Sequence, residues 1–170
     1  SSGKAVSIMK ALSTYQVALD NWGTMTLSEI IPYVTQAAEQ GIRVTENLHN
    51  LIDSSYEKLY MHEASRELWL KDGLTVPEVG DVIYNPDLID TLNLIAENGI
   101  EYFYEGPIAQ EIVDIIQADG GVMNMNDLKT AMTDVLVIDD PVEVTYRGYK
   151  LYSMPLPSSG GVIVGEILNI

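Results

Sequence analysis

The chain has 170 residues, 46% of them hydrophobic, a composition typical of a globular protein with a real core. It carries 25 acidic residues against nine Lys and Arg, and this net charge of −16 repels nucleic-acid phosphates and anionic membrane surfaces. No apolar run approaches the roughly 18 residues of a membrane-spanning helix. We therefore expect neither a nucleic-acid partner nor a membrane span in this segment.

Metal and cofactor chemistry has little support in the sequence. Cysteine is missing, which excludes disulfides, thiolate zinc sites and a cysteine nucleophile. The two histidines, His49 and His62, are too far apart to share a helical turn. Four aspartates lack the spacing of a calcium-binding loop and are expected on the solvated surface: Asp114, Asp119, Asp139 and Asp140. We predict no cofactor and no metal.

Helical periodicity dominates the chain up to about Met132. The first apolar stripe is spaced by four, three and four residues: Ile8, Leu12, Tyr15 and Leu19. Thr26 and Glu29 have the spacing of a capping box, in which each side chain bonds the backbone amide of the other residue. The helix that they open is expected to end at Gly41.

Five more helices are predicted from stripes, caps and prolines. Their expected ranges are 45 to about 60, 63–70, 85–98, 108–118 and 124–132. The side chains expected inward on three of them are Leu48, Ile52 and Leu59, then Leu88, Leu92, Ile95 and Ala96, then Ile112, Ile115 and Ile116.

The period changes from helix to strand near the end of the chain. Two β-patterned runs, 142–146 and 150–152, flank the turn at Arg147-Gly148, and an apolar segment follows to Ile170. The fold class expected is therefore mainly α with a C-terminal β-hairpin (α+β). We expect one domain, 1–170, with a helical part at about 5–133 and the hairpin plus the start of a helix at about 141–170.

The loop Ser158-Ser159-Gly160-Gly161 could present free amides as an anion or oxyanion site at a helix start. A serine cap, with glycines permitting a tight turn, explains the same residues more simply. Arg147 could clamp a carboxylate, although an ion pair or a turn role is favoured.

Two further candidates have simple explanations as well. Ser1 could act as a nucleophile that uses its own α-amine as base, but a remnant of processing explains it better. The aromatic run Tyr102-Phe103-Tyr104 is interpreted as core packing where a helix meets a loop.

Three ordered blocks resemble the γ-glutamyltransferase (γ-glutamyltranspeptidase) family. The first is ALDNWGTM at 18–25. The second combines NG at 98–99, YFYEG at 102–106, IA at 108–109, GG at 120–121 and DL at 127–128. The third combines YRGY at 146–149, SMP at 153–155 and PSSGG at 157–161. Their order is similar to the middle and later part of the family's large subunit.

The resemblance implies a segment of an N-terminal-nucleophile hydrolase of αββα fold, made as a precursor that cuts itself in two. It implies an enzyme that cleaves γ-glutamyl amides such as glutathione and transfers the γ-glutamyl group to water or to amino-acid or peptide acceptors. The partners implied are the rest of the large subunit and the small subunit. The location implied is extracellular, periplasmic or at the cell surface.

No catalytic, substrate-binding or metal residue is carried over to this chain. The family's nucleophilic threonine, serine pair and oxyanion glycines belong to the small subunit, and its carboxylate-binding arginine lies upstream. We expect the chain alone to be inactive and, because its last helix is still apolar at Ile170, to be part of a longer protein and to self-associate. The alternatives are a freestanding acidic helical interaction module, or a related acylase or poly-γ-glutamate depolymerase.

Overall fold

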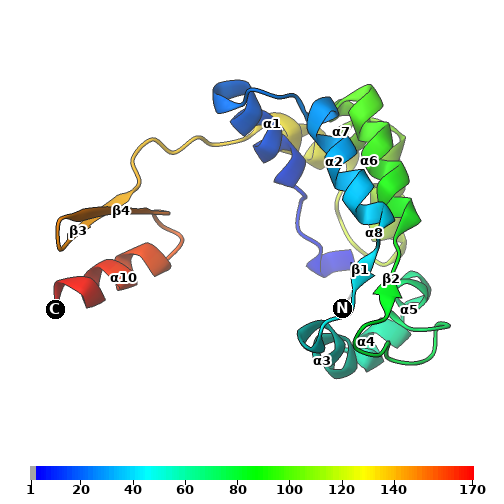
Figure 1. Cartoon of the computed structure of the whole chain (residues 1–170). Coiled ribbons are helices and arrows are strands. Elements are labelled where there is room, and N and C mark those ends of the chain that lie inside the picture. Colours follow the sequence, from blue (N-terminus) through cyan, green and yellow to red (C-terminus); the bar gives the residue numbers. More distant parts are fainter. Residues whose placement is uncertain (1–2) are drawn as a thin grey trace. The chain divides into compact units, whose positions relative to one another are not determined.

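The computed structural model describes residues 3–170, so the candidate Ser1 lies outside the described residues. The chain divides into two compact units, residues 3–135 and Leu136–Ile170. The first is helical apart from two very short strands, and the second is a β-hairpin with one helix (Figure 1). The expected fold class, mainly α with a C-terminal β-hairpin, is confirmed.

The first unit begins with the 3-10 turn η1 (Gly3–Ala5). Its helices are α1 (Ala11–Trp22), α2 (Leu27–Glu39), α3 (Glu46–Ser54), α4 (Tyr56–Tyr60), α5 (Glu63–Trp69), α6 (Pro86–Asn98), α7 (Glu101–Tyr104), α8 (Pro107–Ala118) and α9 (Met125–Thr133). Its strands are β1 (Ile42–Arg43) and β2 (Val82–Ile83). The second unit holds β3 (Val142–Tyr146), β4 (Tyr149–Ser153) and α10 (Gly160–Asn169).

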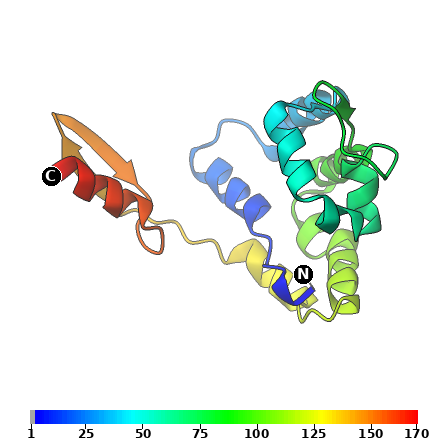
Figure 2. The same ribbon diagram turned by 90° about the horizontal axis from the view of Figure 1, so that it is seen from below.

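Helices α2 and α6 lie side by side, as Figures 1 and 2 both show. The capping box predicted for α2 is present: Thr26 Oγ1 accepts from the Glu29 amide, and Glu29 accepts from the Thr26 amide. Asn85 caps α6 in the predicted way, with Pro86 in the first turn. Short-range rules therefore place the two helices that form one side of the core.

The main core lies where α6, α7, α8 and α9 meet. Tyr104 and Leu128 are fully buried there. The cluster consists of Ile31, Ile95, Ile100, Tyr104, Ala109, Val113, Ile116, Met123, Leu128 and Ala131. Tyr104 therefore packs as the aromatic run predicts, and its ring also contacts Phe103 edge to face at 5.0 Å.

A second, smaller core lies beside the antiparallel pair β1–β2, in which Ile42 faces Ile83. Its buried members are Val44, Ile52, Leu70 and Ile83. The strands were not expected, because runs of two residues carry no visible period.

Three details of the expected helices are wrong. Leu88, expected inward on α6, is 46% exposed. The helix predicted over 45 to about 60 breaks at Ser55, where the neighbouring Ser54 hydroxyl donates to the Leu51 carbonyl and competes with the helical pattern. Helix α8 turns Val113 inward and leaves Ile115 63% exposed. An isoleucine-rich stretch fits more than one stripe, so the period alone gave the wrong face.

In the second unit, β3 and β4 pair antiparallel, with Val142 opposite Ser153 and Tyr146 opposite Tyr149. Helix α10 lies along the hairpin, as both ribbon views show. Alternate residues of β3 are half-buried, the pattern of a strand with one covered face.

Candidate functional site

The loop before α10 is the first candidate site. Ser159 stands at the cap position with φ −84° and ψ −16°, and within residues 3–170 its side chain makes no capping bond. Its carbonyl accepts from the Ile163 amide at 3.1 Å. The predicted serine cap is therefore wrong: Ser159 begins the helix through its backbone, not through its hydroxyl.

The glycines of this loop have a packing role. A Cβ on Gly161 would lie 2.6 Å from Ser153 Cβ, and one on Gly165 would lie 2.6 Å from Val144 Cγ2. Neither residue has a positive φ in the described chain, so a tight turn does not explain Gly161. The two glycines, four apart on one face, let α10 approach the hairpin closely.

A small cleft of about 250 Å³ lies between α10 and the hairpin. It is lined by Val142, Val144, Leu151, Tyr152, Ser153, Gly160, Gly161 and Val164. None of these side chains is a carboxylate, histidine or lysine, so the cleft offers no general base to activate an alcohol. The unit's geometry serves packing.

Arg147 is the first central residue of the hairpin turn. Its φ is 49° and that of Gly148 is 85°, the two positive values of a type I′ turn. The guanidinium lies 5.0 Å from the centre of the Tyr146 ring. The favoured turn role is therefore confirmed, and within the described residues Arg147 forms no ion pair.

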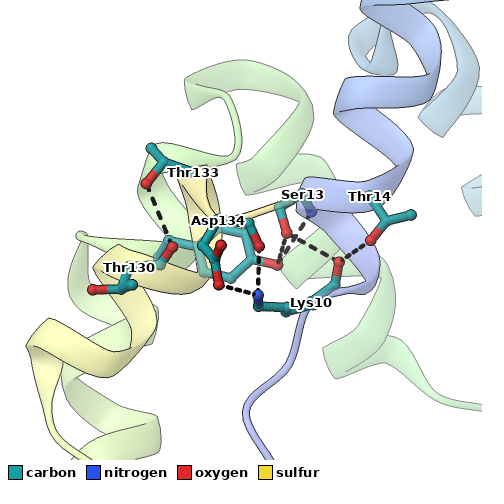
Figure 3. A network of polar contacts seen from close by, with 7 residues as sticks. Lys10, Ser13, Thr14, Thr130, Thr133 and Asp134 are labelled. Carbon is teal, nitrogen blue, oxygen red and sulfur yellow. Dashed lines mark hydrogen bonds and ion pairs between the residues drawn. The ribbon is translucent and has the colours of Figure 1, made fainter. Parts of the chain in front are cut away.

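A polar network joins the start of α1 to the end of α9 (Figure 3). Lys10 Nζ donates to the carbonyl of Asp134 and, at 2.8 Å, to its carboxylate. The Lys10 carbonyl accepts from the hydroxyls of Ser13 and Thr14 at 3.0 and 2.8 Å. Hydrogen bonding and charge from Lys10 lower the pKa of Asp134 below its ordinary 3.8.

Tyr104 extends this network into the core. The buried Ser13 amide donates to the Tyr104 hydroxyl at 3.2 Å, and that hydroxyl donates to Ser13 Oγ at 3.4 Å. Ser13 is 0% exposed, and its hydroxyl is used by the backbone of Lys10. The network therefore anchors α1, and Ser13 is not free to act as a nucleophile. The aromatic packing of Tyr104 was predicted, but a partner 91 positions away in the sequence gives no local signal.

A cleft of about 370 Å³ beside the smaller core is lined by parts of α5, β2 and the loop between them. Lys71 and Asp81 form an ion pair of 3.1 Å across it. A hydrogen bond from Lys71, and a second from the Glu78 amide, lower the pKa of Asp81 below its ordinary 3.8. Nearby, His49 Nδ1 lies 2.8 Å from the Pro77 carbonyl. These contacts close the loop over the core.

The remaining candidates take structural roles or stay on the surface. Asp119 accepts from the Gly3 amide at 2.7 Å, and Asp114 accepts from Gln110 at 2.8 Å. Asp139 and Asp140 are exposed. Over residues 3–170, no three His, Asp or Glu side chains are grouped to hold a metal ion.

The family model for gamma-glutamyltranspeptidase matches residues 1–170, the whole chain. The chain belongs to the gamma-glutamyltranspeptidase family. The family resemblance stated from the three sequence blocks is therefore confirmed.

Relatives in this gamma-glutamyltranspeptidase family agree with the match. The chain is 37% identical over 157 residues to the glutathione hydrolase proenzyme of Escherichia coli K12, covering 92% of this chain and 26% of that protein. It is 31% identical over 167 residues to the acylase ACY 1 proenzyme of a Pseudomonas species (strain V22), covering 98% of this chain and 29% of that protein. It thus spans less than a third of the length of these relatives.

The fold of the chain is similar to that of a solved gamma-glutamyltranspeptidase structure. The crystal structure of Helicobacter pylori gamma-glutamyltranspeptidase aligns with a TM-score of 0.86 at 30% identity, covering 98% of this chain and 47% of that one. In the described part of the chain, no helix is both long and apolar enough to cross a membrane.

Proposed function

We propose that this chain is a large-subunit segment of an enzyme that cleaves γ-glutamyl amides such as glutathione and transfers the γ-glutamyl group to water or to amino-acid or peptide acceptors. The match of the family model to residues 1–170 carries the proposal. The proenzyme names of the relatives support a precursor that is cut into subunits.

Within such an enzyme, the segment is a scaffold and does not supply the nucleophile. Covalent catalysis by an alcohol needs a base beside it and donors for the oxyanion. Ser13 is buried and bonded to backbone, and within residues 3–170 neither Ser158 nor Ser159 has a hydrogen bond to a base. The nucleophile, on this proposal, comes from the small subunit.

The surface of α10 supports a covered position in a larger protein. Val162, Ile163, Val164 and Ile167 are between 39% and 64% exposed on this helix. Exposed apolar side chains grouped on one helix mark a surface that a partner or another part of a larger protein covers. We expect the isolated chain to self-associate through such surface, as light scattering would report; a clean monomer at high concentration would contradict this expectation.

The test uses γ-glutamyl-p-nitroanilide with two proteins: the product of the natural reading frame and the 170-residue chain alone. The full product is expected to split into two subunits and release p-nitroaniline, and the chain alone is expected to release none. Robust turnover by the chain alone would overturn the scaffold role. A full product that splits but turns over no γ-glutamyl amide would overturn the substrate class.

A second candidate function is acyl-amide hydrolysis on another acyl group, such as that of an acylated antibiotic. The acylase relative, 31% identical over 98% of the chain, favours this candidate. The ratio of kcat/KM for the acylated antibiotic to that for γ-glutamyl-p-nitroanilide decides between the two, with poly-γ-glutamate as a third substrate. A natural reading frame that ends near Ile170 would instead favour the freestanding interaction module.

A further inference from the structure

An apolar groove of about 410 Å³ lies between α1, α2 and α6 of the helical unit. It is lined by Leu12, Tyr15, Ala18 and Leu19 of α1, by Leu27, Ile30, Ile31 and Val34 of α2, and by Leu92 of α6. No lining side chain carries a charge. The groove is therefore a surface for apolar groups.

Two of these lining residues are far more exposed than apolar core positions. Tyr15 is 58% and Val34 is 47% exposed, although both continue regular stripes on their helices. The α2 residues are spaced at i, i+3, i+4 and i+7, the positions that a helix uses to contact another helix. The two stripes line a shared groove that the chain itself leaves open.

The charge around the groove selects its occupant. The three helices that form it carry six acidic residues and no Lys, Arg or His. These acids are Asp20, Glu29, Glu39, Asp87, Asp90 and Glu97. In this groove, a second copy of the same acidic helices would place like charges together and is disfavoured as the occupant. Basic flanks on the occupant would instead be attracted and would set its register.

We propose that the groove receives an amphipathic helix with Lys or Arg at its flanks, contributed by the rest of the precursor polypeptide. This rests on the proposed function, which makes the chain part of a longer proenzyme. The relatives are long enough to contain such a segment outside the region matched here, because this chain covers only 26% and 29% of their lengths. Helix-in-groove docking uses apolar anchors at i, i+3 or i+4, and i+7, and the groove offers matching stripes.

The chain has no cysteine, so single cysteines can report on the groove by their rate of reaction with a maleimide. Tyr15→Cys and Val34→Cys place the probe in the groove. Tyr33→Cys is the matched control, since Tyr33 is 67% exposed on α2 and does not line the groove. Each variant is made in the 170-residue chain and in the natural full-length product, and labelling is followed by peptide mass spectrometry. Circular dichroism checks that each variant folds.

Cysteine at the two groove positions is expected to label at least about tenfold more slowly in the full-length product than in the chain alone, whereas Tyr33→Cys changes less than about twofold. Equal labelling of the groove positions in both proteins would overturn the proposal. Equal protection of all three positions would overturn it too, because it would indicate broad burial.

The occupant is identified with benzophenone maleimide attached to the cysteine of Tyr15→Cys in the full-length product. On illumination, the benzophenone should crosslink to a peptide outside these 170 residues. That peptide is expected to have apolar residues at helical spacing and basic flanks. Capture of a second copy, or of an acidic segment, would overturn the proposal. Turnover of γ-glutamyl-p-nitroanilide by the same proteins is scored separately. An active enzyme whose groove stays accessible would overturn only the docking proposal. A protected groove in a protein without turnover would overturn only the proposed γ-glutamyl activity.

Discussion

Arg147 has a left-handed backbone conformation, which Gly, Asn and Asp adopt more readily than arginine does. Its φ of 49° is left-handed, a region in which a residue other than Gly, Asn or Asp is strained by roughly 1 kcal/mol. We predict that Arg147→Asn raises the opening free energy of the hairpin by about 0.5–1 kcal/mol, measured by hydrogen exchange of the β3 and β4 amides. The matched variant Gly148→Ala, at φ 85°, should lower it. Faster exchange in Arg147→Asn would contradict the turn assignment.

The side chain of Tyr104 has two roles. Its ring packs in the core, and its hydroxyl accepts the one hydrogen bond that the described residues provide for the Ser13 amide. Tyr104→Phe keeps the ring but leaves that buried donor unpaired, so we predict a loss of about 1–3 kcal/mol in the free energy of unfolding. Urea denaturation measures it. Tyr102→Phe, at a half-buried neighbour, is the control and should change stability by less than about 0.5 kcal/mol. Equal effects of the two variants would mean that the hydroxyl of Tyr104 contributes nothing specific.

At the scale of elements, packing of α10 on the hairpin depends on two glycines. A Cβ at residue 165 would lie 2.6 Å from Val144 Cγ2, so Gly165→Ala must push the helix from β3. We expect this variant to lose about 1–3 kcal/mol of stability, by overpacking. Gly160→Ala is the matched control, because nothing lies within 4 Å of a Cβ there, and it should be neutral or slightly stabilising. Hydrogen exchange of α10 and β3 measures both, and a Gly165→Ala variant as protected as the parent would disprove close packing.

The elements also mark how far the sequence could be interpreted. Thr26 with Glu29, and Asn85 with Pro86, start helices through contacts within four residues, so their starts could be predicted. The inward face of α8 could not be, because its isoleucines fit more than one stripe. The family resemblance predicted the protein family, which periodicity could not, because the resemblance depends on the identities of particular residues.

The candidate loop before α10 shows a different limit. The sequence predicts a serine cap and a tight turn there. In the structure, Gly161 instead allows α10 to pack closely against Ser153 of β4, 8 positions earlier in the chain. Close packing between two elements depends on the tertiary structure, so it cannot be predicted from composition or local sequence pattern. The anchor of α1 through Lys10 and Asp134 has the same origin, with 124 positions between its partners.

For the whole molecule, the net charge of −16 leaves few cations to offset the acids. Within residues 3–170, four of the nine Lys and Arg form ion pairs: Lys10, Lys71, Lys129 and Lys150. All four pairs are partly solvated, so each contributes modestly. Their partners nevertheless set the response to acid, because hydrogen bonds from lysines lower the pKa of Asp81, Asp134 and Glu143.

The Lys71–Asp81 pair gives this response a definite sign. Because the pKa of Asp81 is lower in the folded chain than its ordinary 3.8, its stabilisation is present above that value and is lost as the pH falls through the lowered one. The pKa of Lys71 is raised above 10.5 by hydrogen bonding to Asp81, so its share is lost only as the pH rises through that raised value. Between these limits the pair is fully formed.

Lys71→Met should therefore lower Tm at pH 7 by on the order of one or two degrees, and the difference from the parent should shrink as the pH falls through the lowered pKa of Asp81. Lys58→Met removes the same charge from a lysine with no recorded ion pair in the described residues, so its difference should not follow that titration. Thermal unfolding followed by circular dichroism from about pH 2.5 to about pH 7 compares the three proteins over the range in which carboxylates titrate. If the Lys71→Met difference were the same at both ends of that range, the pair would have no part in the acid response, because protonating Asp81 must abolish any stabilisation that its charge provides.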